Sequence, residues 1–156
     1  MTMRPSQKHT ATDSHATSSV DECHLIELPR ERHANGSLTV AENGNARMPF
    51  AVRRVFYLYD VPADAERGGH SHHCARELMV ALSGSFDVTL DDGCRRRTFS
   101  LNRPYRALYV PAGLWRTIDN FSGGAVCLVL TSERYDPDDY VRQYDRFMEL
   151  TSPKRK

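Results

Sequence analysis

Between residues 52 and 130, turn-forming residues divide the sequence into short segments that alternate apolar and polar residues or are apolar throughout. Along one such segment Phe86, Val88 and Leu90 fall on one face of a strand, and Asp-Asp-Gly at 91–93 forms a tight turn after it. Short strands separated by regularly spaced turns are typical of an all-β barrel or sandwich. We therefore expect strands over residues 23–28, 37–41, 52–59, 70–72, 78–82, 85–90, 94–101, 107–110, 115–120 and 125–130, with a polar loop from Pro29 to a turn at Asn35-Gly36.

The two ends of the chain do not follow this pattern. Residues 1–22 are rich in Ser, Thr, Asp and His without an apolar stretch, so they are expected to form a disordered tail. Residues 23–150 then make one domain, and 151–156 a frayed basic tail. Near the C-terminus, Asp136 is a good N-cap and Pro137 suits the first helical position. They predict one amphipathic helix, whose apolar stripe consists of Tyr140, Val141, Tyr144, Phe147 and Met148.

Charge and cysteine content exclude several classes of function. The formal net charge is +1, which argues against a nucleic-acid-binding protein held by phosphate contacts. No apolar run is long enough to span a bilayer. The four cysteines are widely spaced and form no Cys-x-x-Cys pair, which fits reduced thiols in a cytoplasmic protein.

The segment 68–84 concentrates side chains that can transfer protons. If its first part is a strand, period-two alternation places His70 and His72 on the same face, and Glu77, at the start of the next apolar strand, can point into the same space. Histidines at alternate positions also occur on ordinary polar surface strands. The second half of the chain decides between these interpretations.

Two motifs together resemble those of the cupins. The first is His70-x-His72-x4-Glu77-x6-Gly84, and the second is Pro111-x-Gly113-x2-Arg116-x3-Asn120. The resemblance implies a double-stranded β-helix, or jelly-roll barrel, with its site at the mouth of the barrel and a C-terminal α-helix added.

Arg116 stands where most metal-binding cupins carry a further histidine. A guanidinium has no lone pair for a metal and repels one by its charge. We therefore expect no metal and no other cofactor. His70, His72 and Glu77 still offer the two-histidine, one-carboxylate face of an iron site, which leaves a metal-dependent oxygenase or isomerase as the alternative.

A closer resemblance extends over residues 55–144. The segments that carry it are 54–59 (RVFYLY), 69–72 (GHSH), 81–88 (ALSGSFDV), 101–105 (LNRPY), 110–116 (VPAGLWR) and 120–122 (NFS). Together they are similar to the dTDP-sugar 3,4-ketoisomerases, small cupins that act on dTDP-4-keto-6-deoxyhexoses. The resemblance implies an isomerase that converts dTDP-4-keto-6-deoxy-D-glucose into a dTDP-3-keto-6-deoxyhexose. Such a product leads to dTDP-3-amino-3,6-dideoxyhexoses for surface polysaccharide such as the O-antigen of lipopolysaccharide, or for glycosylated metabolites.

The resemblance also assigns roles to individual residues. His70 is expected to remove the C3 proton and His72 to move protons between the oxygens or to C4, although the reverse order is equally compatible, as is either configuration at C4. Arg116 or Arg67 would stabilise the enediolate. The remaining expected substrate contacts are Tyr57, Tyr59, Glu77, Arg103, Arg106 and Trp115.

The family further implies a homodimer in which the N-terminal strands are exchanged between barrels. It implies neither a nucleic-acid partner nor a membrane. Besides the metal-dependent cupin, a sugar-nucleotide-binding cupin without catalytic activity is a further alternative.

Overall fold

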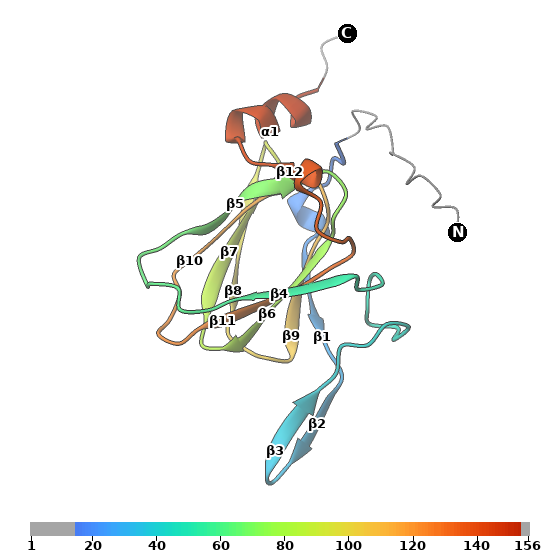
Figure 1. Ribbon diagram of the computed structural model, residues 1–156, viewed down its shortest axis with the longest axis vertical. Helices are drawn as coiled ribbons and strands as arrows, with labels where there is room; N and C mark the ends of the chain where they lie inside the picture. Colours follow the sequence, from blue (N-terminus) through green and yellow to red (C-terminus); the bar gives the residue numbers. More distant parts are fainter. Residues whose placement is uncertain (1–14, 154–156) are drawn as a thin grey trace, which may run out of the picture.

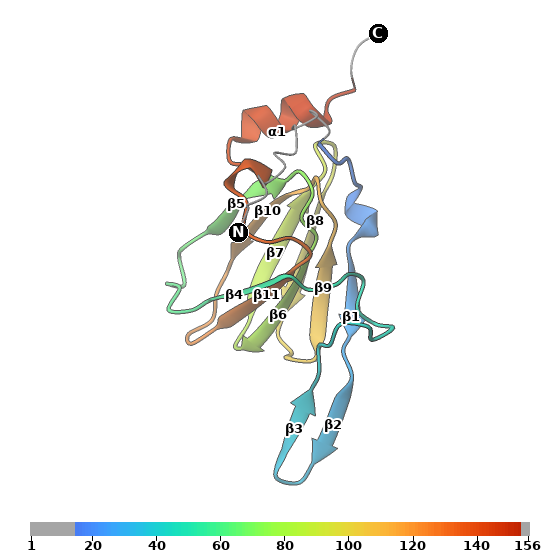
Figure 2. The same cartoon turned by 45° about the vertical axis from the view of Figure 1, so that its right-hand side comes forward.

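The computed structural model describes residues 15–153, which form a jelly-roll barrel of two facing antiparallel sheets (Figures 1 and 2). The first sheet consists, in spatial order, of β1 (His24–Glu27), β9 (Arg106–Val110), β6 (Glu77–Ser83), β11 (Val126–Thr131) and β4 (Arg54–Leu58). The second consists of β12 (Tyr140–Val141), β5 (Arg67–His72), β10 (Trp115–Asp119), β7 (Phe86–Asp91) and β8 (Arg96–Leu101). The expected all-β fold with a C-terminal helix is confirmed.

The core lies between the two sheets. Val88 and Leu90 on β7 are completely buried, and Phe86 is 1% exposed, which confirms the alternation expected of this strand. They pack against apolar side chains of the facing sheet, including Met79 and Val129. Burying each such side chain contributes about 1.5–3 kcal/mol. This core holds the strands that carry the histidines in a fixed register.

The polar loop expected after Pro29 is instead a β-hairpin, so that expectation was wrong. Strands β2 (Arg30–His33) and β3 (Gly36–Thr39) pair antiparallel, and the turn lies at 34–35. The hairpin is stabilised by backbone pairing and has no apolar face. The sequence therefore shows no alternation of apolar and polar residues there that would predict both strands. The hairpin extends away from the barrel (Figures 1 and 2).

The N-terminal boundary also differs from the expected one, because residues 15–22 pack against the barrel. A 3-10 turn, η1 (Val20–Glu22), is capped by Ser19, and Val20 is 2% exposed within the core. Before it, His15 Nδ1 lies 3.0 Å from His73 Nδ1. Residues 1–14 of the expected tail lie outside the described residues, as do 154–156 of the C-terminal tail.

The C-terminal helix begins later than its capping signals indicate. Asp136 does act as an N-cap, but of a 3-10 turn, η2 (Pro137–Asp139). The chain then forms the short strand β12, and the α-helix α1 spans Tyr144–Thr151. Pairing of β12 with β5 supplies backbone hydrogen bonds that a longer helix would forgo, so the tertiary context overrides the local signal.

No helix within the described residues is long and apolar enough to cross a membrane. The four cysteines are free, as expected. Burial raises the pKa of the Cys23 and Cys127 thiols to about 12, so these two are protonated and unreactive at neutral pH.

Candidate active site

His70 and His72 lie on β5 and face each other inside the barrel, as their alternate spacing predicts. Their ring centroids are 4.9 Å apart in an edge-to-face arrangement. The register of β5 with β10 is irregular next to Arg116, which pairs with His70. Gly68, with φ of 87°, lies at this bulge, where a Cβ atom would be 2.9 Å from the Arg116 carbonyl oxygen. Glycine therefore permits the close strand approach that directs the histidines inward.

Each histidine has its Nδ1 atom engaged. His70 Nδ1 lies 3.3 Å from the Gly68 carbonyl oxygen, and His72 Nδ1 lies 2.9 Å from Asp139 Oδ2. Both partners only accept hydrogen bonds, so both Nδ1 atoms carry the proton. Both Nε2 atoms are buried and have no hydrogen-bond partner among the described residues. The Nε2 atom of His70 is thus available to a substrate, and that of His72 forms no hydrogen bond within the described residues but has the Glu77 carboxylate nearby.

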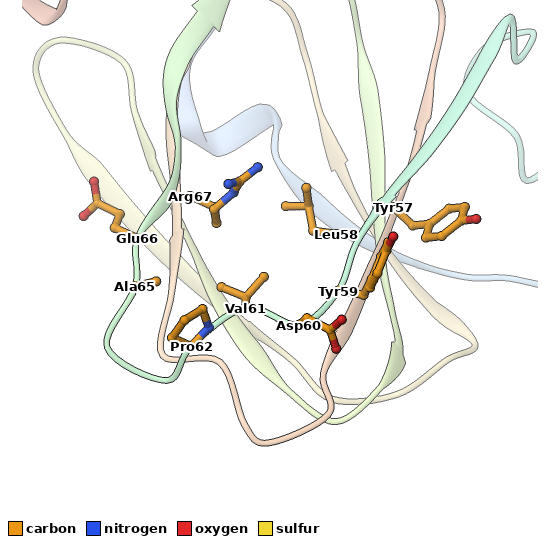
Figure 3. Close-up of a pocket in the computed structure, with 9 residues that line it drawn as sticks. All are labelled: Tyr57, Leu58, Tyr59, Asp60, Val61, Pro62, Ala65, Glu66 and Arg67. Carbon is orange, nitrogen blue, oxygen red and sulfur yellow. The ribbon is translucent and has the colours of Figure 1, made fainter.

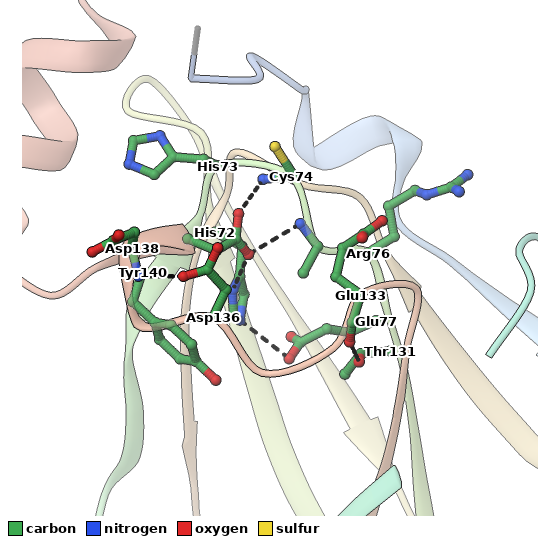
Figure 4. Close-up of polar contacts among 12 residues, drawn as sticks. His72, His73, Cys74, Arg76, Glu77, Thr131, Glu133, Asp136, Asp138 and Tyr140 are labelled. Carbon is green, nitrogen blue, oxygen red and sulfur yellow. Dashed lines mark hydrogen bonds and ion pairs between the residues drawn. The ribbon is translucent and has the colours of Figure 1, made fainter. Parts of the chain in front are cut away.

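A buried ion pair crosses the barrel beneath the histidines. Arg116 Nη2 donates a hydrogen bond to Glu77 Oε1 over 2.9 Å, and Arg116 Nε lies 2.6 Å from Glu77 Oε2. Glu77 Oε1 is also 3.4 Å from His72 Nε2 (Figure 4). Glu77 and Arg116 are 1% and 3% exposed. The Glu77 carboxylate is therefore engaged by Arg116 and lies against His72, where it can orient the imidazole.

These charges separate the proton affinities of the two histidines. Burial, reinforced by the charges of Arg116 and His72, lowers the pKa of His70 to about 3. Burial also disfavours the cationic form of His72, but the hydrogen bond to Asp139 and the adjacent Glu77 carboxylate outweigh it and raise the pKa of His72. Burial opposes ionisation of Glu77 as well, yet the adjacent Arg116 charge keeps the pKa of that carboxyl far below its usual range. The site thus holds a neutral His70 beside a His72 whose pKa is raised.

An iron ion held by His70, His72 and Glu77 was the alternative raised by the first motif. Their ligand atoms do lie within 4.8 Å of one another. However, the Arg116 guanidinium contacts both oxygens of the Glu77 carboxylate and would place a fixed positive charge beside the ion. The residues present therefore do not fit a metal held in this way.

An aromatic and cationic rim around the histidines was missed by the sequence analysis. The Tyr140 ring centroid lies 4.9 Å from that of His70 and 4.5 Å from that of His72. Its hydroxyl accepts a hydrogen bond from Arg54 Nη1 over 3.2 Å, and Arg54 also lies over the Tyr135 ring. Tyr140 reads as part of a helix stripe in the sequence, and only its pairing with His72 through β12 and β5 places it here.

Tyr57 and Tyr59 line an open hollow of about 390 Å³ together with Arg67 (Figure 3). Phe56 and Leu58, which alternate with the two tyrosines, pack against the core. The two tyrosines are 60% and 61% exposed. Any contact that they make with a substrate would be at the outer edge of the site.

Trp115, Arg103 and Arg106 are not brought to the histidines in this chain. The Trp115 ring packs against Tyr144, with centroids 5.3 Å apart, beneath α1. Arg106 pairs with Glu27 at 3.5 Å, and Arg103 hydrogen-bonds the adjacent Asn102 carbonyl. Arg106 is the first residue of β9 and Arg103 precedes it, whereas Val110, which pairs with Glu77, is the last residue of that strand. Within one chain the two arginines are therefore remote from the ion pair.

Comparisons with known proteins point to one kind of relative. The family model described as FdtA, WxcM-like, C-terminal matches residues 21–152. The chain is 40% identical over 123 residues to the TDP-4-oxo-6-deoxy-alpha-D-glucose-3,4-oxoisomerase of Aneurinibacillus thermoaerophilus, covering 79% of this chain and 88% of that protein.

Solved structures give the same picture. The WlaRB TDP-quinovose 3,4-ketoisomerase of Campylobacter jejuni is 38% identical with a TM-score of 0.78, covering 83% of this chain and 99% of that one. A mutant of the 3,4-ketoisomerase QdtA of Thermoanaerobacterium thermosaccharolyticum, in complex with TDP-4-keto-6-deoxyglucose, is 33% identical with a TM-score of 0.81. That match covers 85% of this chain and 96% of the mutant chain.

Proposed function

Because this chain belongs to the FdtA (WxcM-like, C-terminal) family, we propose that it is an isomerase that moves the ketone of dTDP-4-keto-6-deoxy-D-glucose from C4 to C3. The relatives that are 33–40% identical carry out or are named for this chemistry on TDP-linked sugars. The observation that carries the proposal is the buried pair of histidines with both Nε2 atoms unengaged.

The reaction needs only proton transfers. Removal of the C3 proton gives an enediolate. Protonation of its O4 atom, loss of the O3 proton and delivery of a proton to C4 then give the 3-ketone. C3 is oxidised as C4 is reduced within the same molecule, so no external electron acceptor is consumed. Two imidazoles within reach of adjacent carbons suit such acid-base catalysis.

We assign removal of the C3 proton to His72, which reverses the order expected from the resemblance. A proton arriving on His72 produces an imidazolium beside Asp139 and Glu77, whose negative charges stabilise it. A proton arriving on His70 would face burial and the Arg116 charge, which hold the pKa of His70 at about 3. Neutral His70 instead accepts a hydrogen bond at Nε2 and relays a proton between the substrate oxygens.

Arg116 and Arg67 are the proposed sources of positive charge for the enediolate. Arg116 lies beside His70 through the pairing of β10 with β5, and Arg67 begins β5 and lines the hollow with Tyr57 and Tyr59. In a partly dry barrel such charges stabilise a developing oxyanion more than they would in water. We propose that the hollow receives the more distant part of the sugar nucleotide.

The chemistry of the product indicates which class of reaction would follow. A 3-keto sugar nucleotide is a substrate for an aminotransferase, which would yield a 3-amino-3,6-dideoxyhexose for a surface polysaccharide or a glycosylated metabolite. We propose that the protein acts at this step, in the cytoplasm where sugar nucleotides are made.

We also propose a homodimer with exchanged N-terminal strands. The β2–β3 hairpin extends from its own barrel, and Leu38 on it is 55% exposed. An apolar groove of about 400 Å³ that includes Leu82, Tyr105 and Leu128 offers a second chain a place to pack.

Light scattering tests the dimer. Wild type should give twice the mass of one chain, and Leu38→Asp should shift the measured mass toward that of a single chain. A monomeric wild type would contradict the exchange, whereas His33→Asn on the same hairpin is the control expected to remain dimeric.

Proton NMR in deuterated water, with a chelator present, tests the reaction directly. Purified wild type mixed with dTDP-4-keto-6-deoxyglucose should form a 3-keto product that carries solvent deuterium at C4. The same reaction in ordinary water retains H4, whose coupling to H5 will give the C4 configuration. Absence of product, with activity only after iron is added, would replace the proposal with a metal-dependent cupin. Ligand binding without turnover under both conditions would indicate a binding protein.

A further inference from the structure

Asp139 binds the far side of His72 and is itself held in place by the backbone. Its Oδ2 accepts hydrogen bonds from His72 Nδ1 at 2.9 Å and from the Ala75 amide at 3.2 Å. Its Oδ1 accepts from the Cys74 amide at 2.7 Å. The Asp139 side chain is 11% exposed. Three donors therefore fix the carboxylate before any ligand binds.

The segment that carries Asp139 is tied to the histidine strand by the main chain. The Asp139 carbonyl oxygen accepts from the His73 amide over 2.8 Å, and Tyr140 pairs with His72 in the β12–β5 ladder. Figure 4 shows His72 between this segment and Glu77. Displacement of Asp139 would require these backbone bonds to break as well.

The consequence concerns which nitrogen of His72 carries the proton. A carboxylate can only accept, so a neutral His72 next to Asp139 must be protonated at Nδ1 and must keep its lone pair at Nε2. Without Asp139, the neutral imidazole would place its proton on Nε2, toward Glu77 Oε1 at 3.4 Å, and Nε2 could then accept no other proton.

We propose that Asp139 is a positioning residue that fixes the Nδ1–H tautomer and ring orientation of His72, so that the Nε2 lone pair faces the substrate. The inference rests on the proposed role of His72 as the base. It assigns a function to a residue that the sequence indicates only as an acidic group near a helix start.

Asp139→Asn tests this because it preserves shape while reversing one hydrogen bond. With the side-chain oxygen kept on the Cys74 amide, the shortest of the three contacts, the new amide nitrogen faces His72 Nδ1 and also the Ala75 amide, which loses its acceptor. His72 must then accept at Nδ1 and carry its proton on Nε2. We expect kcat to fall about 10⁴-fold, as for the equivalent change in a Ser-His-Asp triad, with KM changed less than about threefold.

Nitrogen-15 NMR of the imidazoles supplies a readout that does not depend on turnover. Neutral His72 should be the Nδ1–H tautomer in wild type and the Nε2–H tautomer in Asp139→Asn. The matched control is Asp138→Asn, which removes the same charge from an exposed neighbour and should leave kcat and tautomer unchanged. If Asp139→Asn does not fold, Asp139→Ala with added formate replaces it, and formate should restore part of kcat.

The outcomes separate this inference from the proposed function. Wild-type kcat in Asp139→Asn, or an unchanged His72 tautomer, would overturn the inference. An inactive wild type that nevertheless shows the tautomer switch would overturn the isomerase while leaving the placement of His72 by Asp139 intact. If Asp138→Asn and Asp139→Asn lose the same amount of kcat, the loss comes from the change in net charge and not from the contact with His72. That result would also overturn the inference.

Discussion

Arg116→Met is expected to lower the free energy of unfolding by about 3–5 kcal/mol, because it leaves the Glu77 carboxylate buried with only His72 to compensate its charge. Arg116 supplies both the 2.6 Å and the 2.9 Å contacts to that carboxylate. Urea unfolding followed by fluorescence measures the change, since Trp115 is the only tryptophan in the chain and packs against Tyr144 of α1.

Two further variants show whether the loss comes from the uncompensated charge. Arg96→Met removes an exposed arginine that also pairs with a carboxylate, Asp91, which keeps hydrogen bonds from Tyr144 and Gly93, and it should cost far less than Arg116→Met. Arg116→Met combined with Glu77→Leu removes both charges and should recover most of the stability. If Arg116→Met proves as mild as Arg96→Met, or if the double variant is no more stable than the single one, the ion pair does not stabilise the barrel as argued.

The parts of the site that could be predicted from the sequence are those set by local geometry. Period-two alternation places His70 and His72 together whatever surrounds them, and the turn residues on either side of β7 and β8 define that hairpin. Arg116 was also expected from its position in the second motif. Its partner, Glu77, was expected at the site but as a substrate contact, because the cross-barrel distance between β6 and β10 is not encoded in either segment alone.

The parts that could not be predicted depend on contacts between distant segments. The acidic residues at 136–139 carry a genuine capping signal, and a 3-10 turn satisfies it as well as an α-helix would. Nothing in that stretch indicates that the Cys74 and Ala75 amides donate hydrogen bonds to Asp139. The inward or outward direction of Tyr57 is similarly undetermined by alternation, because both of the possible faces of β4 carry aromatic residues.

His72→Asn is expected to reduce kcat about 10³-fold and His70→Asn by about 10²-fold or less, because the two histidines are unequal bases. The imidazolium of His72 is stabilised by Asp139 at 2.9 Å and Glu77 at 3.4 Å. His70, whose pKa is held at about 3, contributes a neutral hydrogen-bond acceptor. The measurement is the rate at which solvent deuterium enters the sugar and product appears by NMR, with KM recorded for each variant.

Exchange at C3 distinguishes the two orders of proton transfer. With His72 as the base, His72→Asn abolishes both loss of the C3 proton and product formation, whereas His70→Asn still releases that proton, since enediolate formation needs only His72 and relay between the oxygens comes later. His24→Asn, which changes an exposed histidine on β1, controls for the loss of an imidazole as such. If instead His70→Asn alone stops exchange at C3, then His70 is the base. The lowered pKa of His70 would then have to rise through contacts with the bound substrate, because only a base with a pKa near the working pH removes a proton from carbon efficiently.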